Sequence, residues 1–413
     1  MFMKYKLIFI AGTAFLIALS MFLVVNHSII FSYFTLAYML VIAFVAYGYK
    51  PCEKKHTPSC DVLIPAFNEG KHIYKTIKSV MQSDYPDFRV IAIDDGSTDD
   101  TRQWMEKAKA EFPEITTIFC EKNRGKKHAL AEGIRRSNSE LIVTIDSDSS
   151  ILPDSLANLL SPFHDPQVGA VAGNICVQNL KRGLIPKLMD IIFVFSYELF
   201  RSSQSRFGSV LCTPGALSAY RRTAVLPLMK KWLNQRFMGR KTSIGEDRAL
   251  TCMLLQEKWK VLYQETAKAY TNMPENYISL CKMLLRWVRG DIRENILMAP
   301  YIFRRASLTD LKSAGLAFHY IIFNIGILSP VVVSPVLIVY LITHFQTAAV
   351  MLPYMLLMTL MWSVVPTIIY ARKQSWRYCL HAFTYSLYSL VFLLWIPFYA
   401  LLTLDNNNWL TRK

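Results

Sequence analysis

Three long stretches without a charged side chain limit what this chain can fold into. Residues 7–49, 313–371 and 378–404 contain no Asp, Glu, Lys or Arg. A helix needs roughly 20 mostly apolar residues to cross a bilayer. The first two stretches are each long enough for two such helices. The third is broken by Pro397 and rich in Tyr, His and Ser, and its residues alone leave open whether it crosses the membrane or lies in the interface.

The basic residues around the first stretch predict its orientation. Lys4 and Lys6 precede it, and Lys50, Lys54 and Lys55 follow it. Basic residues on both flanks place both flanks in the cytoplasm. The stretch is also too long for a cleaved signal peptide. We therefore predict a multi-pass protein of the inner or plasma membrane with a cytosolic domain between its spans.

The net charge of +16 has to be explained by a partner. Residues 181–241 hold twelve Lys and Arg against two acidic residues, and this basic region lies beside membrane segments. Membrane lipids with anionic headgroups and an anionic nucleotide substrate account for this charge. We expect no binding of nucleic acid. The eight cysteines include no C-x-x-C pair and are interpreted as reduced thiols.

The middle of the chain alternates between short apolar stretches and helical patterns. Each apolar stretch ends in acidic or amide residues, and this alternation predicts a mostly parallel sheet with ligands beyond the carboxyl ends of its strands. The predicted strands lie in 60–70, 89–100 and 140–150, and the predicted helices span 70–83, 99–111 and 126–137.

The third predicted strand, within 140–150, ends in a D-x-D pattern that suits a metal ion. Asp146 and Asp148 are alternate residues, so both carboxylates can point the same way. Hard carboxylate ligands suit Mg²⁺ or Mn²⁺ bound to phosphates. A capped loop without a ligand is the alternative.

The sequences "DDGS" (94–97) and "DSD" (146–148) together resemble family 2 glycosyltransferases of the GT-A fold. The resemblance implies that Asp95 binds the uracil and ribose of a UDP-sugar, that Asp146 lies beside the nucleotide, and that Asp148 holds the metal. In "NRGKKHAL" (123–130), it places Lys126 and Lys127 near the diphosphate, with a solvated helix start as the alternative.

The sequence "GEDR" (245–248) resembles the hyaluronan synthases and the rhizobial chitooligosaccharide synthases within that family. The resemblance implies that Glu246 and Asp247 are catalytic and that Asp247 is the general base. A carboxylate in hydrogen-bond reach can take the proton of a sugar hydroxyl as the new bond forms. Acidic residues at a helix start also act as caps, which is the alternative.

The sequence "MLLRW" (283–287) resembles the Q-x-x-R-W motif of processive members, which implies that Trp287 lines the acceptor site and that Arg286 lies near the diphosphate. Met283 replaces the Gln. If an amide is merely missing, we expect Met283→Gln to leave the products unchanged or to lengthen them. In "CTPG" (212–215), Cys212 is out of register with the cysteine of hyaluronan synthases, so no priming cysteine is assigned.

The end of the chain carries a further resemblance. "WLTR" (409–412) is similar to the W-G-T-R and W-L-S-R endings of the same two groups. This implies that residues 378–404 lie in the membrane interface and that the tail is cytosolic, with Trp409 and Arg412 near the active site. A frayed terminus is the alternative. Residues 185–200 and 280–301 mix apolar residues with flanking Lys and Arg, so we expect helices lying in the membrane surface, with core packing as the alternative.

The expected fold is an α/β GT-A domain with a mostly parallel, Rossmann-like sheet, inserted between transmembrane helices. The expected parts are 1–55 (two spans), 56–275 (catalytic domain), 276–312 (interface helices with the RW motif) and 313–413 (two spans, an interface segment and the tail).

The expected activity is processive, inverting transfer from UDP-N-acetylglucosamine, with or without UDP-glucuronate, to a growing polysaccharide acceptor that the enzyme secretes. A chitooligosaccharide or poly-N-acetylglucosamine synthase, a non-processive transferase to a lipid carrier, and a transporter with a nucleotide-binding domain are the alternatives.

Overall fold

The fold is taken from a computed structural model that describes residues 37–305, 310–343, 360, 363–371 and 379–407. The first predicted span and part of the second therefore lie outside the described residues. The same is true of most of residues 344–362, where a further span is predicted, and of Trp409 and Arg412.

One half of the central sheet is parallel, as the alternating pattern predicts. Its strands are β1 (Cys60–Ala66), β2 (Phe88–Asp94), β3 (Thr116–Phe119) and β4 (Leu141–Thr144), in the order β3-β2-β1-β4. Each neighbouring pair is parallel. The strands are buried because helices and loops cover both faces, which explains their continuous apolar sequences.

The helices between these strands lie where the sequence predicts them. They are α2 (Lys71–Met81), α3 (Thr101–Glu111) and α4 (Lys126–Arg136). In α2 the buried residues Ile73, Ile77 and Val80 recur at helical spacing and pack against the sheet. The expectation of three strands alternating with helices is thus confirmed, and the structure adds the strand β3 between α3 and α4, which the sequence analysis did not predict.

The other half of the sheet mixes directions, which the sequence does not predict. β7 (Ser218–Arg221) is antiparallel to both β4 and β6 (Val168–Val177). β10 (Lys260–Thr271) runs parallel to β6, and β5 (Ser149–Ile151) pairs antiparallel with β10 at the edge. The complete order is β3-β2-β1-β4-β7-β6-β10-β5.

Short elements connect this second half. They are α5 (Ser155–Leu160), α7 (Ser202–Arg206), α8 (Arg222–Val225), α9 (Met229–Leu233), α10 (Glu246–Gln256), the 3₁₀ turns Ser161–His164, Leu180–Arg182 and Leu226–Leu228, and the hairpin strands β8 (Arg236–Phe237) and β9 (Arg240–Lys241).

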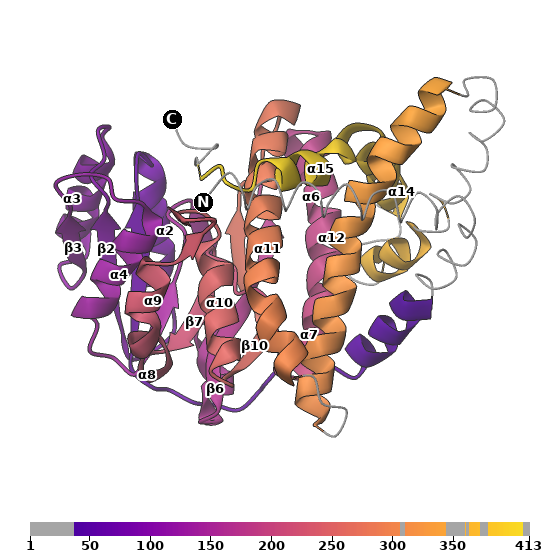
Figure 1. Ribbon diagram of the computed structural model, residues 1–413. Coiled ribbons are helices and arrows are strands. Elements are labelled where there is room, and N and C mark those ends of the chain that lie inside the picture. The colour runs from indigo at the N-terminus through magenta and orange to yellow at the C-terminus, as the bar shows by residue number, and fades with distance from the viewer. Residues whose placement is uncertain (1–36, 306–309, 344–359, 361–362, 372–378, 408–413) are drawn as a thin grey trace.

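A group of helices, of which α11 and α12 are the longest, lies to one side of the sheet (Figure 1). It contains α6 (Leu184–Phe195), which continues as a π-helix over Ser196–Arg201, α11 (Tyr277–Arg305), α12 (Leu311–Thr343), α14 (Cys379–Tyr388), a π-helix over Ser389–Leu393 and α15 (Trp395–Leu402). The helix Ala37–Tyr47 and the helical residues 363–371 lie with them. The two amphipathic helices predicted at 185–200 and 280–301 are present as α6 with its π-turn and as α11.

Within the described ranges, no single helix combines the length and the hydropathy that a membrane crossing needs. A bent pair, Ala382–Leu393 followed by Trp395–Leu402, meets both conditions together, with 43° between its halves. The bend precedes Pro397, which lies in the first turn of α15, where a missing N–H is tolerated.

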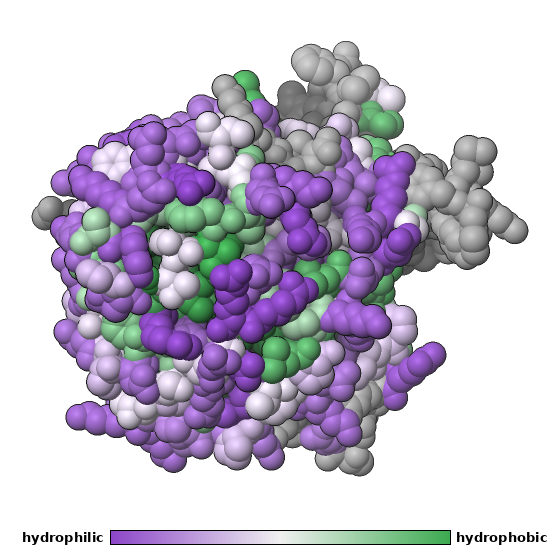
Figure 2. Space-filling view, turned by 90° about the vertical axis from the view of Figure 1, so that its left-hand side faces the viewer, coloured by the Kyte–Doolittle hydropathy of each residue, from purple (hydrophilic) through white to green (hydrophobic). Residues whose placement is uncertain are grey.

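The opposite end of the molecule presents a different surface. The face on the α3 side is mostly hydrophilic, with hydrophobic residues visible in a hollow near its centre (Figure 2). The main core lies between the sheet and α2, α4, α5 and α10. A second apolar cluster joins α6, α11 and α15.

Candidate active site

The polar ends of the parallel strands meet at one edge of the sheet. Ala66 of β1 is in register with Asp94 of β2, and Leu63 is in register with Thr144 of β4. The loop after β1 is joined to the loop after β2, because the Asn68 N–H donates to Ser97 Oγ and the Thr98 N–H donates to Asn68 Oδ1, both at 2.9 Å. This edge is therefore organised by its own loops.

Asp95 fixes the loop that precedes α4. Its carboxylate accepts the N–H groups of Arg124 at 3.0 Å and Gly125 at 2.7 Å. Gly96 beside it has a φ of +73°, and a Cβ there would lie 2.6 Å from the carbonyl carbon of Lys122. Only glycine combines this φ with so close an approach. The nucleotide-binding role of Asp95 stays a prediction.

Lys126 joins three of the predicted motifs. Its ammonium group forms an ion pair with Asp146 and a second one, at 3.2 Å, with Glu246. Burial alone would lower the pKa of Lys126, but the charges of Asp146 and Glu246 outweigh it and raise the pKa above its ordinary value. Lys126 is therefore a fixed cation between the D-x-D turn and the "GEDR" turn.

Asp247 lies half-buried beside this ion-pair cluster. Its carboxylate accepts the Arg248 N–H at 2.8 Å and the Gly215 N–H at 3.3 Å. Burial, together with the charge of Glu246, raises the pKa of Asp247 to about 6. A carboxylate with that pKa is still ionised at neutral pH and is a stronger base than an ordinary one.

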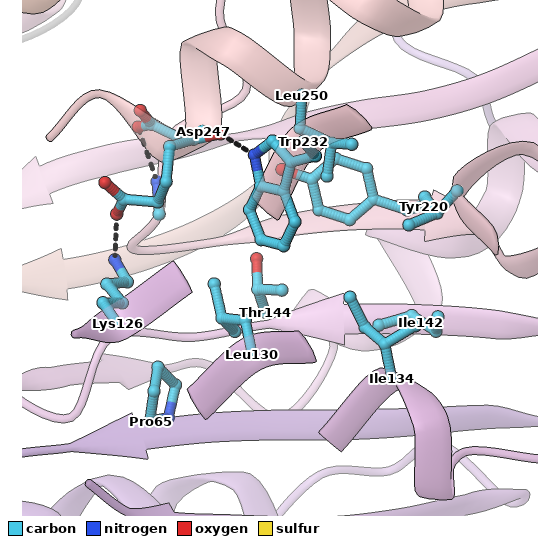
Figure 3. Close-up of a pocket in the computed structure, with 13 residues that line it drawn as sticks. Pro65, Lys126, Leu130, Ile134, Ile142, Thr144, Tyr220, Trp232, Asp247 and Leu250 are labelled. Carbon is cyan, nitrogen blue, oxygen red and sulfur yellow. Dashed lines mark hydrogen bonds and ion pairs between the residues drawn. The ribbon is translucent and has the colours of Figure 1, made fainter. Parts of the chain in front are cut away.

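A pocket opens beside these charged groups (Figure 3). Lys126 and Asp247 lie at one end of it, and its other walls are largely apolar. The lining comes from β1, β4, β7, α4, α8, α9, α10 and the loop before β7. Its residues are Pro65, Lys126, Leu130, Ile134, Ile142, Thr144, Gly215, Tyr220, Val225, Trp232, Glu246, Asp247 and Leu250.

Trp232 is a site residue that the sequence analysis missed. It is almost fully buried in α9, and its Nε1 donates to the backbone carbonyl of Glu246 at 2.9 Å. This bond holds the start of α10, and with it the two acidic side chains. No motif surrounds Trp232, so only the packing of α9 on α10 reveals its role.

Lys127 is directed away from Asp146. Its ammonium group lies within 3.4 Å of Gln235 Oε1 and of the Thr242 oxygens, and it lies 5.5 Å from the centre of the Trp232 ring. Burial lowers the pKa of Lys127 to about 8. Of the two lysines in "NRGKKHAL", Lys126 is the one placed among the predicted site residues.

Asp148 follows β4 on the turn into β5, and its side chain is exposed. Asp146, two residues earlier, is half-exposed at the edge where the loops converge. The described residues contain no group of three or more His, Cys, Asp or Glu side chains arranged for a metal. Any metal held here would thus need oxygen ligands from elsewhere, such as a diphosphate.

The RW motif lies on α11, which approaches the "GEDR" turn closely. Gly245 has a φ of +75°, and a Cβ on it would lie 3.2 Å from the Cα of Gly290. Arg286 is half-buried, and the ring of Trp287 stacks against Phe193 of α6 with centroids 6.1 Å apart. Two facing glycines therefore let α11 touch the turn that carries the acidic pair.

Met283 is buried in the apolar cluster between α6, α11 and α15. The expectation that a glutamine could simply replace it does not fit this environment. We now expect Met283→Gln to lower the melting temperature and activity together, because a buried amide without partners costs roughly 1–3 kcal/mol. Met283→Leu, which keeps volume and polarity, is the matched control and should behave as wild type. Unchanged melting and activity in the glutamine variant would contradict the expectation.

The C-terminal segment reaches the loop before "GEDR". Asn407 Oδ1 accepts a bond from Arg293 at 2.7 Å, and Asn407 Nδ2 donates to the Lys241 carbonyl at 2.8 Å. Ser243 Oγ donates to the Asn407 carbonyl at 2.8 Å, and Arg240 pairs with Asp405 at 3.5 Å. Trp409 and Arg412 lie outside the described residues, but the segment leading to them is attached beside the acidic pair.

Comparisons with known proteins identify the family of this chain. The model of the family described as "Glycosyl transferase family 2" matches residues 61–226. An N-acetylglucosaminyltransferase of Rhizobium meliloti (strain 1021) is 31% identical over 368 residues, which cover 88% of this chain and 83% of the relative. A hyaluronan synthase of Streptococcus pyogenes is 32% identical over 302 residues, or 71% of this chain and 72% of the relative.

A solved structure supports the fold. A mannosyltransferase from Pyrobaculum calidifontis, in complex with GDP-Man and Mn²⁺, superposes with a TM-score of 0.61. The match covers 90% of this chain and 98% of that one, at 18% sequence identity. The sheet is accordingly that of a GT-A glycosyltransferase. With relatives this similar over most of their length, the chain belongs to glycosyl transferase family 2 and is a glycosyltransferase.

Proposed function

We propose that this enzyme transfers N-acetylglucosamine from UDP-N-acetylglucosamine to the growing end of a β-linked polysaccharide, with or without alternating glucuronate. The observation that carries the proposal is the cluster of Lys126, Asp146, Glu246 and Asp247 at the carboxyl ends of the strands. The relatives with the names N-acetylglucosaminyltransferase and hyaluronan synthase support this substrate class.

The donor nucleotide would lie at the edge formed by the loops after β1, β2 and β4. Asp95 would hold the uridine, with Asp146 beside it, and the two cations Lys126 and Arg286 would face the diphosphate. Charge-assisted bonds from fixed cations are stronger than neutral hydrogen bonds. Because Lys126 is already held by two carboxylates, it needs little reorganisation when the diphosphate gains negative charge.

A divalent metal fits the D-x-D turn. The exposed Asp148 carboxylate can hold Mg²⁺ or Mn²⁺ together with diphosphate oxygens, which are the hard ligands that these ions prefer. Such an ion, when bound, would stabilise the charge of the departing UDP. The Mn²⁺ in the mannosyltransferase of the same fold is in keeping with this proposal.

Asp247 would act as the general base. It would take the proton from the acceptor hydroxyl while that oxygen attacks the anomeric carbon and the bond to UDP breaks. A single displacement of this kind inverts the configuration and forms no covalent enzyme intermediate. Glu246, paired with Lys126, would keep negative charge beside Asp247, and the Gly215 and Arg248 N–H groups would orient its carboxylate.

The pH dependence follows from the raised pKa of Asp247. A general base works only when ionised, so kcat/KM for UDP release should fall as the pH drops below about 6. On the acidic side the decrease should approach roughly tenfold per pH unit. Initial rates between pH 5 and pH 8 measure it, with a melting curve at each pH as the control for folding. A profile that stays flat down to pH 5 would rule out this assignment.

We further propose that the helices beside the sheet contact membrane lipids and that the sheet domain is cytosolic. Large apolar side chains on these helices are exposed, among them Phe44 at 81% and Phe303 at 72%. On α15 and the turn before it, Val391, Phe392 and Tyr399 are also exposed. A row of exposed apolar residues is costly in water but is favourable against lipid.

The C-terminal tail is proposed to complete the site, and two truncations separate its parts. Removal of residues 408–413 keeps the Asn407 contacts and deletes Trp409 and Arg412. Removal of residues 405–413 deletes the Asn407 contacts as well. If the tail binds the substrate, both truncated proteins should lose polymer synthesis while they remain folded. If only Asn407 matters, the shorter deletion should retain the wild-type rate. Wild-type synthesis by both would assign the tail to a frayed end.

One experiment separates the proposed function from its alternatives. The purified full-length protein is incubated with UDP-N-acetylglucosamine, with and without UDP-glucuronate, and both UDP release and products are measured. Long polymer with one donor points to a chitooligosaccharide or poly-N-acetylglucosamine synthase, and polymer that needs both donors points to a hyaluronan synthase. A single transfer points to a lipid-carrier transferase, and absence of UDP release in all arms would overturn the proposal.

A further inference from the structure

Two buried arginines on α11 form no ion pair with any of the described residues. Arg289 and Arg293 are four residues apart, so they lie on one face of the helix. Only 2% of Arg289 and 1% of Arg293 is exposed. Neither guanidinium forms an ion pair with any residue in the part of the chain that the structure describes. By contrast, the buried Arg248 pairs with Asp291 at 3.3 Å.

The hydrogen bonds of the two guanidinium groups are incomplete. Arg289 donates twice to Thr403 Oγ1, at 3.1 and 2.7 Å, and Arg293 Nη1 donates to Asn407 Oδ1. The remaining nitrogens, Arg289 Nη1 and Arg293 Nε and Nη2, are buried and have no acceptor among the described residues.

The acidic side chains nearby are already engaged. Asp405 pairs with Arg240, and the Glu294 carboxylate accepts the amide of Gln235 at 3.0 Å on both oxygens. Burial lowers the pKa of both Arg289 and Arg293, but a guanidinium stays charged in proteins. Asp405 near Arg289 and Glu294 near Arg293 offset part of this burial cost, but the pKa of each arginine is still lowered. A bound anion would reduce the remaining cost of burying these charges.

The location of the pair connects it to the site. Asn407, the acceptor for Arg293, is bonded to the loop of Lys241 and Ser243 that leads into Glu246. Arg289 is adjacent to Gly290, which faces Gly245 of the "GEDR" turn. The guanidinium nitrogens of Arg289 and Arg293 that lack an acceptor therefore lie close to the turn that carries Glu246 and Asp247.

We propose that Arg289 and Arg293 form an oxyanion-binding site beneath the segment 403–407, and that its ligand is an oxyanion of the sugar nucleotide. The inference rests on the proposed function, because that function supplies the nucleotide. Planar guanidinium forks bind carboxylates and phosphates through paired hydrogen bonds. The oxyanion therefore comes from one of two sources, the carboxylate of a uronic acid donor or the diphosphate common to all donors.

Entry of the ligand requires the segment 403–407 to move. Thr403 and Asn407 lie over the two guanidinium groups, and an exposed ion pair between Arg240 and Asp405 helps to hold the segment. An exposed ion pair contributes little stability, so this attachment is easily broken. The segment would close again on the bound anion.

Binding measurements on variants test the proposal. Arg289→Met and Arg293→Met remove the charge and keep an apolar stem, and Arg289→Lys and Arg293→Lys keep the charge and lose the fork. Arg182→Met removes an exposed arginine paired with Glu275 and is the matched control. Dissociation constants for UDP, UDP-N-acetylglucosamine and UDP-glucuronate are measured by calorimetry on the full chain in lipid nanodiscs.

Loss of a charge-assisted contact should weaken binding by roughly 10- to 100-fold. If only UDP-glucuronate is weakened, the carboxylate is the ligand, and if all three nucleotides are weakened alike, the diphosphate is. Unchanged affinities in the Met and Lys variants overturn the proposal. A wild-type protein that binds none of the nucleotides overturns the proposed function instead, so the two failures are distinguishable.

Thermal melting supplies a second readout. Without nucleotide, the Met variants should melt at or above the wild-type temperature, because each removes a buried charge that has no ion-pair partner among the described residues. A nucleotide that binds the variants more weakly should raise their melting temperature less than it raises that of the wild type. A variant that melts well below wild type while binding all nucleotides normally would show that the arginines serve packing alone, which overturns the proposal.

Discussion

Asp247→Asn is expected to abolish sugar transfer while leaving the donor bound. The asparagine has the same shape, and its side-chain oxygen can still accept the Gly215 or Arg248 N–H. It cannot take a proton from the acceptor hydroxyl. Loss of a general base typically costs about 10²–10⁴-fold in rate. Initial rates of polymer formation and calorimetric affinity for the UDP-sugar measure the two effects separately.

The control for this variant lies at the C-terminal end of the same helix. Glu257 follows the last turn of α10 and is exposed, so Glu257→Gln removes one negative charge without touching the pocket. It should retain the wild-type rate and melting temperature. A general base contributes a rate factor of about 10² or more. If the Asp247→Asn enzyme therefore transfers sugar at a rate within about threefold of the wild-type rate, another group must be the base.

The second large effect is expected at Asp148. Asp148→Ala should lower UDP release by at least about 10²-fold, because a metal on the leaving diphosphate supplies several kcal/mol of charge stabilisation. The side chain is exposed, so the variant should fold normally. Chelation of the wild type with EDTA should reproduce the loss, and addition of Mg²⁺ or Mn²⁺ should restore the wild type alone.

Asp154→Ala is the matched control for this second variant. Asp154 is an exposed acid just beyond β5, and it accepts a bond from Asn158. Its removal should leave UDP release and the response to EDTA unchanged. Full activity of the wild-type enzyme in EDTA would exclude a divalent metal from the reaction and would return Asp148 to the role of a loop residue.

Much of the parallel half of the sheet was predictable because its signals are local. An apolar stretch that ends in acidic residues, followed by a helical pattern, is complete within about 30 residues. That is why β1, β2, β4 and α2–α4 lie where the sequence places them. Parallel strands share one carboxyl edge, so the gathering of Asp95 and Asp146 at that edge also follows from the pattern.

The second half of the sheet was not predictable in this way. β7 inserts antiparallel between β4 and β6, and β5 returns to pair with β10 across more than a hundred residues. Such pairings depend on which strand edge remains open once the first half has formed. The four residues of β7, Ser218–Arg221, carry no signal of the direction of the strand.

The sequence by itself determined which residue types stand at the strand ends and which motifs are present, because backbone periodicity and turn chemistry act over a few residues. Only the tertiary structure decided the electrostatics of the site. Lys126 meets Glu246 across 120 positions in the chain, and Trp232 anchors the turn that holds Asp247. The raised pKa of Asp247 arises from burial and from neighbouring charge, and both exist only after distant segments have packed together.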